Sequence, residues 1–96
     1  MFIVTLTYLQ PVEQVDALMA DHVAWLQRHY DDGLFVVSGR RVPRVGGVIL
    51  ARSGDEPALR AALAADPFAI HGAARFDLVE FTPTLTAPGA QALLGL

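Results

Sequence analysis

The sequence has no cysteine and no lysine. Without cysteine, the chain has no disulfide framework, no thiolate nucleophile and no cysteine-based metal site. Its seven basic residues are all arginines, and its formal net charge is −3. It therefore does not have the broad basic face that would neutralise several nucleic-acid phosphates.

Long hydrophobic runs are absent too, because no stretch approaches the roughly 20 apolar residues that span a membrane. The first residues are typical of a strand and not of a secretory signal, so we expect a cytoplasmic protein with no membrane partner. With 96 residues, of which 53% are hydrophobic and 18% charged, the chain is apolar for a small soluble protein. We expect one domain over residues 1–96 and an oligomer that buries the extra apolar surface.

Hydrophobic periodicity predicts the order β-α-β-β-α-β. Strands alternate apolar and polar residues, whereas helices space apolar residues by three and four. The predicted strands are residues 2–9, 34–38, 48–52 and 75–82, and the predicted helices are residues 15–30, a second one from about 53–57 to 66, and a short C-terminal one within 86–96. This order is the ferredoxin-like α+β fold, a four-stranded antiparallel sheet with two helices on one face.

Turn residues mark the connections between these elements. Asp55 or Ser53 is placed to cap the second helix. Residues 39–47 predict a long hairpin connection, within which Gly46-Gly47 indicates a bulge or a close approach of two backbones. No helix covers the second face of the sheet, although the strands supply apolar residues for both faces. The simplest way to bury it is a homodimer that joins two sheets into a dimeric α+β barrel.

His22 is the strongest functional candidate because it lies on the apolar face of the first helix. It follows Val15 by seven residues and precedes Leu26 by four, which brings all three to nearly the same side. An imidazole in that position is either a satisfied core group or a proton-transfer group. The sequence leaves both interpretations open.

Asp66 is the candidate partner of His22. Asp66-Pro67 suits the N-cap and first position of a short turn through Ile70. If both helices lie on one face of the sheet, the end of the second can approach the middle of the first, so that Asp66 reaches His22. A carboxylate on one ring nitrogen fixes the tautomer and leaves the other nitrogen as a base. Alternatively, the pair only tethers the helices.

Five further residues are candidate substrate contacts, each with a structural alternative. A hydroxyl and a backbone N–H at the end of the second strand could face a pocket, although serine and glycine are also common in turns. An arginine could bind an anionic group bidentately or remain solvated, and aromatic residues could line the pocket or the core. These candidates are Ser38, Gly39, Arg40, Tyr8 and Trp25.

The sequence predicts neither a metal site nor a nucleotide cofactor. His22 and His29 are seven residues apart, which is poor chelating spacing, and no H-x-x-x-H pattern occurs. No glycine-rich phosphate-binding motif and no G-x-S-x-G motif occurs either. RNA-recognition domains share the β-α-β-β-α-β order, but the third strand has none of the exposed aromatic residues that stack on bases.

Five segments, in this order, resemble the YCII-related (YciI-like) family over nearly the whole chain. They are His22 with Trp25-Leu26, residues 35–39, residues 46–51, residues 66–68, and Gly72 with Glu80-Phe81. The resemblance implies a dimeric α+β barrel with a catalytic His and Asp, which fall on His22 and Asp66, while the family's Ser-Gly segment falls on Ser38 and Gly39. One characterised relative eliminates chloride from an aromatic substrate. Relatives commonly have Pro where this chain has Arg40, so the resemblance gives no substrate.

These observations predict a small homodimeric enzyme, a lyase or isomerase, that uses His22 as general acid/base and Asp66 to orient it. The substrate would be a small cyclic or aromatic metabolite, and no cofactor is required. The main alternative is a non-catalytic ligand-binding or accessory domain of the same fold. A third class, a structural protein that only assembles, would have no enclosed polar pocket.

Overall fold

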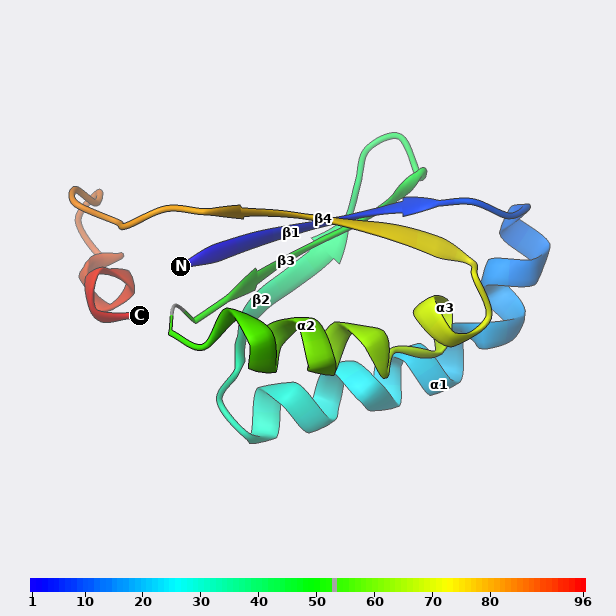
Figure 1. The fold of residues 1–96 in the computed structure, drawn as a ribbon. Coiled ribbons are helices and arrows are strands. Elements are labelled where there is room, and N and C mark those ends of the chain that lie inside the picture. Colours follow the sequence, from blue (N-terminus) through cyan, green and yellow to red (C-terminus); the bar gives the residue numbers. More distant parts are fainter. Residues whose placement is uncertain (53) are drawn as a thin grey trace.

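Within residues 1–52 and 54–96, which the computed structural model describes, the chain forms a four-stranded antiparallel sheet in the order β2-β3-β1-β4 (Figure 1). The strands are β1 (Phe2–Tyr8), β2 (Phe35–Arg40), β3 (Gly46–Ala51) and β4 (Ala74–Glu80). β1 pairs with both β3 and β4, so it lies in the middle of the sheet.

The helices α1 (Val12–Asp31), α2 (Glu56–Ala64) and α3 (Pro67–Ile70) pack on one face of this sheet (Figure 1). The element order and the two-layer arrangement confirm the predicted ferredoxin-like α+β fold. Asp55 caps α2 by accepting a hydrogen bond from Ala58 N at 3.1 Å. Ser53, the other predicted cap, lies outside the described residues.

The first helix begins at Val12, three residues before the amphipathic stretch that starts at Val15. Its first turn includes the position after Pro11 that the proline and the acidic residues Glu13 and Asp16 favour in the sequence. The carbonyl of Pro11 accepts hydrogen bonds from the backbone N–H groups of Gln14 and Val15, so the helix starts directly after the proline. Residues of this first turn are exposed. Apolar periodicity could not detect it because exposed turns need no apolar residue.

The hairpin between β2 and β3 is shorter than the predicted connection, because Arg40 pairs with Gly47 and the loop is only residues 41–45. Gly46 confirms the predicted close approach of backbones. A Cβ atom placed on it would lie 1.7 Å from the carbonyl oxygen of Leu6. Only glycine fits there, and the two central strands meet at this point.

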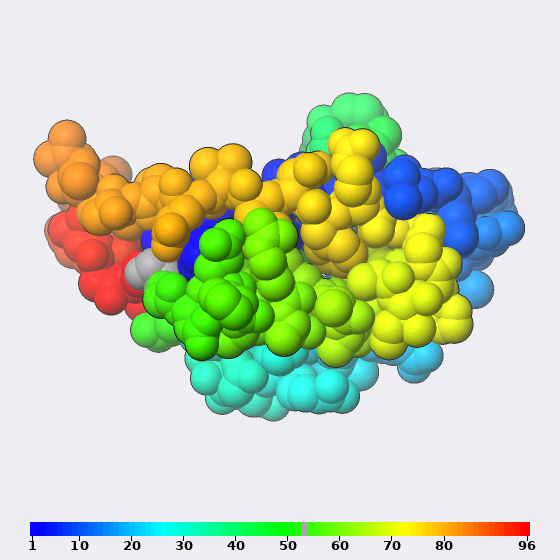
Figure 2. Space-filling model, in the orientation of Figure 1, coloured from blue at the N-terminus to red at the C-terminus, as the bar shows by residue number. Residues whose placement is uncertain are grey.

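The C-terminal helix predicted within residues 86–96 is a 3₁₀ helix, η1 (Gln91–Gly95), beyond the end of the sheet (Figures 1 and 2). Its backbone hydrogen bonds span three residues, as from Leu93 N to Ala90 O. Gly89, with a φ of +93°, precedes this segment, and short 3₁₀ pieces of this kind are common.

The hydrophobic core lies between the sheet and the helices. Alternate residues of β1 point into it, and they meet buried side chains from α1, α2 and α3. Its largest members include Phe2, Val4, Trp25, Leu59 and Phe68. Each such side chain contributes roughly 1.5–3 kcal/mol by its burial. The indole Nε1 of Trp25 also donates to the carbonyl of Ala62 at 2.9 Å, which ties α1 to α2.

The other face of the sheet is not covered by any described helix (Figure 1). The strand register puts an apolar row on it, made of Ile3, Val37, Val48, Leu50 and Val79.

Among the described residues no helix is both long and apolar enough to cross a membrane.

Candidate active site

His22 is buried on the inner side of α1, with only 8% of its surface exposed. Val15 and Trp25, on the same side of the helix, are buried with it. The helical period therefore holds the imidazole against the sheet, as the spacing of apolar residues predicts.

Asp66 is fully buried at the N-terminus of α3. Its backbone is extended, with φ −62° and ψ 130°, and its Oδ1 accepts a hydrogen bond from Phe68 N at 3.0 Å. Pro67 at the first helical position lacks an N–H that would need a partner. Asp66-Pro67 thus forms the predicted N-cap and turn.

The same carboxylate contacts His22, since 2.8 Å separates Nδ1 of His22 from Oδ1 of Asp66. A carboxylate only accepts hydrogen bonds, so Nδ1 carries the proton and donates. In the neutral imidazole the lone pair is then on Nε2, and no described residue forms a hydrogen bond with this atom. The structure brings the predicted pair together in the geometry of an oriented base.

Two aromatic rings pack against the imidazole. The ring of Phe68 stacks on it with 3.9 Å between centroids and 6° between planes, and the indole of Trp25 lies at 5.5 Å. Tyr8 touches the edge of Phe68, with 6.1 Å between centroids. The orientation of His22 is therefore fixed by packing as well as by Asp66.

A cavity of about 260 Å³ opens beside His22, between α1 and the sheet. The wall from α1 is formed by Met19, His22, Val23 and Leu26, which are spaced by three and four residues. The opposite wall comes from β1, β2, β3 and α3. Its residues are Leu6, Tyr8, Ser38, Gly39, Arg40, Gly46, Gly47, Val48, Ile49 and Phe68. The lining is mostly apolar, with a few polar groups.

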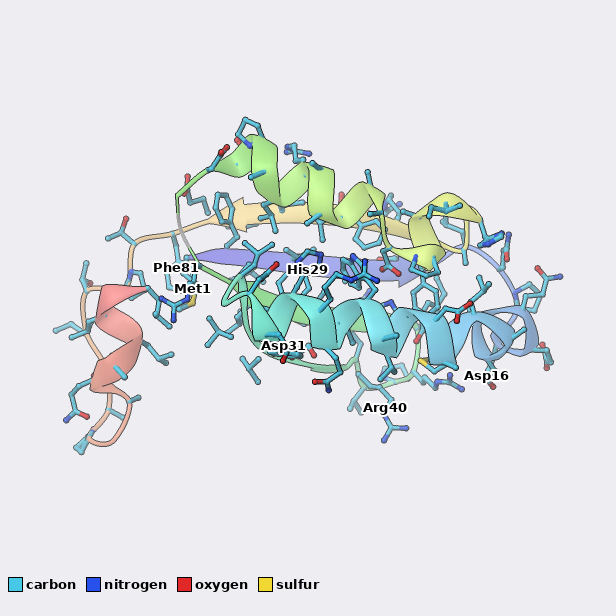
Figure 3. All side chains as sticks on the ribbon, turned by 90° about the horizontal axis from the view of Figure 1, so that it is seen from below. Met1, Asp16, His29, Asp31, Arg40 and Phe81 are labelled. Atoms are coloured by element: carbon cyan, nitrogen blue, oxygen red, sulfur yellow. The ribbon has the colours of Figure 1, made fainter. Side chains whose placement is uncertain are left out.

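Four of the five predicted substrate contacts line this cavity, namely Tyr8, Ser38, Gly39 and Arg40. Arg40 is exposed, and its side chain points outward beside α1 (Figure 3), so it stands at the rim. Trp25 does not line the cavity, because its indole lies behind His22 and bonds to Ala62 O.

The loop 41–45 is held beside the cavity by two arginines. Arg41 donates to Oγ1 of Thr7 at 3.1 Å, and Arg44 pairs with Asp16 of α1. The hydrogen bond and charge of Asp16 raise the pKa of Arg44, and Tyr8 acts in the same direction. Arg44 therefore links the loop to α1.

Tyr30 is a contact that the sequence did not reveal. Its hydroxyl forms a hydrogen bond with Oγ of Ser38, although Tyr30 does not itself line the cavity. The ring meets Phe35 edge to face at 6.2 Å. No local motif marks it, because the two hydroxyls meet only through the packing of α1 against β2.

The remaining histidines lie away from the cavity. His29 bonds to Asp32 at 2.9 Å and lies between α1 and α2 (Figure 3), while His71 is exposed at the end of α3. Within residues 1–52 and 54–96 no three His, Asp or Glu side chains come together as they would in a metal site.

The fold and the site together define a class of protein. It is an antiparallel α+β domain with a buried histidine–aspartate pair beside a cavity. The chain belongs to the YCII-related domain family, whose model matches residues 1–82, as its motifs suggested. Among curated proteins, none matches the chain.

The fold is also similar to a solved enzyme structure. This is 5-chloro-2-hydroxyhydroquinone dehydrochlorinase from Burkholderia phenoliruptrix AC1100, in complex with 2,5-dihydroxybenzoquinone. The TM-score is 0.70, the aligned region covers 84% of this chain and 93% of that one, and the sequences are 14% identical. At this identity the likeness shows the fold.

Proposed function

We propose that the protein is a small-molecule enzyme in which His22 transfers a proton, as general base and then general acid, with Asp66 orienting it. The reaction class is elimination or isomerisation of a small cyclic or aromatic metabolite. The observation that carries the proposal is the 2.8 Å bond between His22 Nδ1 and Asp66 Oδ1 at a cavity wall.

The chemistry follows from the free Nε2 atom. It removes a proton from a carbon beside a carbonyl group, and the C–H electron pair moves into an enolate. In an elimination the enolate re-forms the carbonyl and a leaving group departs from the neighbouring carbon as an anion. In an isomerisation the imidazolium returns the proton to a different carbon. Asp66 stabilises the imidazolium in both cases.

The size and lining of the cavity support this substrate class. A volume of about 260 Å³ is below the range of pockets for drug-sized ligands, so it suits a single ring with a few substituents. The dehydrochlorinase of similar fold acts on such a ring. In this proposal Tyr8, Ser38 and Gly39 contact the substrate, Arg40 attracts it at the rim, and Trp25 acts from behind by supporting His22.

We further propose that the working form is a homodimer joined through the open face of the sheet. That face presents the apolar row Ile3, Val37, Val48, Leu50 and Val79 without a covering helix. A second copy would bury this row by sheet-to-sheet packing. Two-fold symmetry would place the same residues on both sides of the interface.

Proton transfer can be tested by hydrogen exchange in D₂O. A panel of chlorinated hydroquinones, hydroxylated aromatics and lactones is incubated with the protein, and carbon-bound hydrogens are followed by proton NMR. We expect His22→Gln to abolish exchange and turnover. His29→Gln is the matched control, since that histidine lies on the same helix and also bonds to an aspartate.

Two results would contradict the enzyme proposal. The first is that no compound of the panel exchanges or reacts with the wild-type protein. The second is that His22→Gln reacts as fast as wild type. If a compound binds His22→Ala as tightly as wild type and never reacts with either, the protein is a ligand-binding domain.

A further inference from the structure

We infer that Tyr30 is a positioning residue that turns the hydroxyl of Ser38 toward the cavity, where Ser38 donates a hydrogen bond to an oxyanion of the bound ring. This inference rests on the proposed function and deepens it. It specifies a substrate that carries an enolate or phenolate oxygen on the side of the cavity formed by β2.

Either hydroxyl of the Tyr30–Ser38 pair has a hydrogen to donate, so the direction of the bond is assigned from their relative acidity. Each hydroxyl has one hydrogen and two lone pairs. The Tyr30 hydroxyl is partly buried and has no other hydrogen-bond partner among the described residues.

Because the phenol is the stronger acid of the two hydroxyls, we assign Tyr30 as the donor and Oγ of Ser38 as the acceptor. Ser38 keeps its own hydrogen, and its side chain lines the cavity. A hydroxyl that already accepts a hydrogen bond is a better donor, because chains of hydrogen bonds polarise one another. Ser38 thus faces the cavity as a donor.

Both residues are held in place before any ligand arrives. Tyr30 lies in the last turn of α1, and its ring packs against the buried ring of Phe35. Ser38 lies on β2, where it pairs with Ile49 of β3. A donor on such supports need not reorganise when charge develops, and this is the arrangement that stabilises oxyanions.

The donor and the base share one cavity, since His22 and Ser38 both line it. When Nε2 of His22 takes a proton from carbon, the electron pair moves onto the neighbouring carbonyl oxygen. The Ser38 hydroxyl then stabilises this oxyanion by a charge-assisted hydrogen bond. No proton moves along the Tyr30–Ser38 pair, so all atoms and charges balance within the substrate and His22.

The test is the binding of 2,5-dihydroxybenzoquinone, a coloured anionic ring that needs no turnover. Its affinity and visible absorption band are measured with wild type, Ser38→Ala, Tyr30→Phe and the double variant, and thermal unfolding verifies that each is folded. Tyr30→Phe removes one oxygen and keeps the ring on Phe35. Glu56→Gln on the exposed side of α2 is the control for unspecific effects.

With wild type we expect the visible absorption band of the quinone to shift on binding. Ser38→Ala should weaken binding about tenfold, because a hydrogen bond to a charged group is lost, and should abolish this shift of the band. Tyr30→Phe should weaken binding about threefold. In the Ser38→Ala background Tyr30→Phe should have no further effect, because Tyr30 acts only through Ser38.

Three results would overturn the inference. The first is that the quinone does not bind to wild type. The second is that Tyr30→Phe binds the quinone as tightly as wild type. The third is that Tyr30→Phe lowers the affinity by the same factor in the wild-type and Ser38→Ala backgrounds. The proposed function is judged separately, by the loss of turnover in His22→Gln. Either can therefore fail while the other stands.

Discussion

The imidazole of His22 lies parallel to the ring of Phe68, with 3.9 Å between their centroids, and its Nδ1 is bonded to the carboxylate of Asp66, two residues before that phenylalanine. One short segment, Asp66 to Phe68, thus fixes both the direction and the plane of the ring. The N-cap that starts α3 is also the group that selects the histidine tautomer.

Replacing Asp66 by asparagine should separate catalysis from stability. The amide oxygen can still accept from Phe68 N, so the cap survives, but the charge that stabilises the imidazolium is lost. We expect turnover to fall about a hundredfold or more and Tm to fall less than in Asp66→Ala, although the amide N–H₂ would take the buried position of Oδ2, which has no partner among the described residues. Asp66→Ala is the comparison, since it removes the cap as well and should lower Tm. Equal Tm losses in both variants would contradict this division of roles.

Gly46 should tolerate no side chain. In Gly46→Ala the Cβ would lie 1.7 Å from the carbonyl oxygen of Leu6, so the strands must separate. We expect a loss of about 1–3 kcal/mol in the free energy of unfolding, measured with urea. Gly39→Ala is the matched control, because a Cβ there meets no atom within 4 Å. Equal losses in the two variants would exclude the steric explanation.

Trp25→Phe should weaken the contact between α1 and α2. The change removes the indole donor to Ala62 O, and that carbonyl then accepts only from the backbone N–H of Ala65. We expect a loss of roughly 1–3 kcal/mol in the free energy of unfolding. The measurement is urea denaturation followed by far-UV circular dichroism, since Trp25 is the one tryptophan of the sequence. Unchanged stability would show that the indole hydrogen bond contributes nothing net.

We expect Asp32 to make the free energy of unfolding depend on pH in the acid range. The N–H of Leu34, which donates to Asp32, holds the pKa of that carboxyl below its ordinary 3.8; desolvation opposes this and His29 adds to it. A lowered folded pKa stabilises the native state above pH 3.8, and this contribution is lost as the pH falls through the folded pKa.

This effect is tested by urea denaturation of wild type and Asp32→Asn between about pH 7 and about pH 3, because carboxyl groups titrate toward the acid end of this range. The wild type should be more stable at neutral pH, and the difference should shrink toward acid pH. It should be small, because the carboxylate is about half exposed. A constant difference across the range would contradict the assignment.

If the proposed dimer forms, a charge at one exposed apolar position should prevent dimerisation and a charge at another should not. Val79→Arg puts a charge on the open sheet face, whereas Ile70→Arg puts one on α3; the two residues are 61% and 65% exposed. Sedimentation at several concentrations should show monomers for Val79→Arg and dimers for Ile70→Arg and wild type. A wild-type monomer, or a dimer of Val79→Arg, would refute the proposed interface.

The element order could be predicted from the sequence because hydrophobic periodicity and turn residues are local signals. The meeting of His22 and Asp66 could be predicted because the topology places both helices on one face of the sheet. Boundaries were less accurate. The first turn of α1 is exposed, and the ends of β2 and β3 are defined by pairing such as that of Arg40 with Gly47.

Other parts of the site could not be found in this way. Val23 is half exposed and lines the cavity, which the spacing of apolar residues along α1 does not reveal. The Tyr30–Ser38 bond joins residues of two elements, and neither residue belongs to a motif that marks the contact. Sequence periodicity gives the face on which a residue lies, but partners on another element depend on packing.

The exposed hairpin loop has a consequence for the engineering of this scaffold. His22 and Asp66 are supported from behind by the core, whereas Arg40 and Gly46 at the cavity are joined by residues 41–45, which are held by surface contacts such as the Arg44–Asp16 pair. Under the proposed function, reactivity and selectivity would thus depend on separate segments. Variants mutated only within residues 41–45 should therefore differ in the compounds that they bind, while the His22–Asp66 pair remains unchanged.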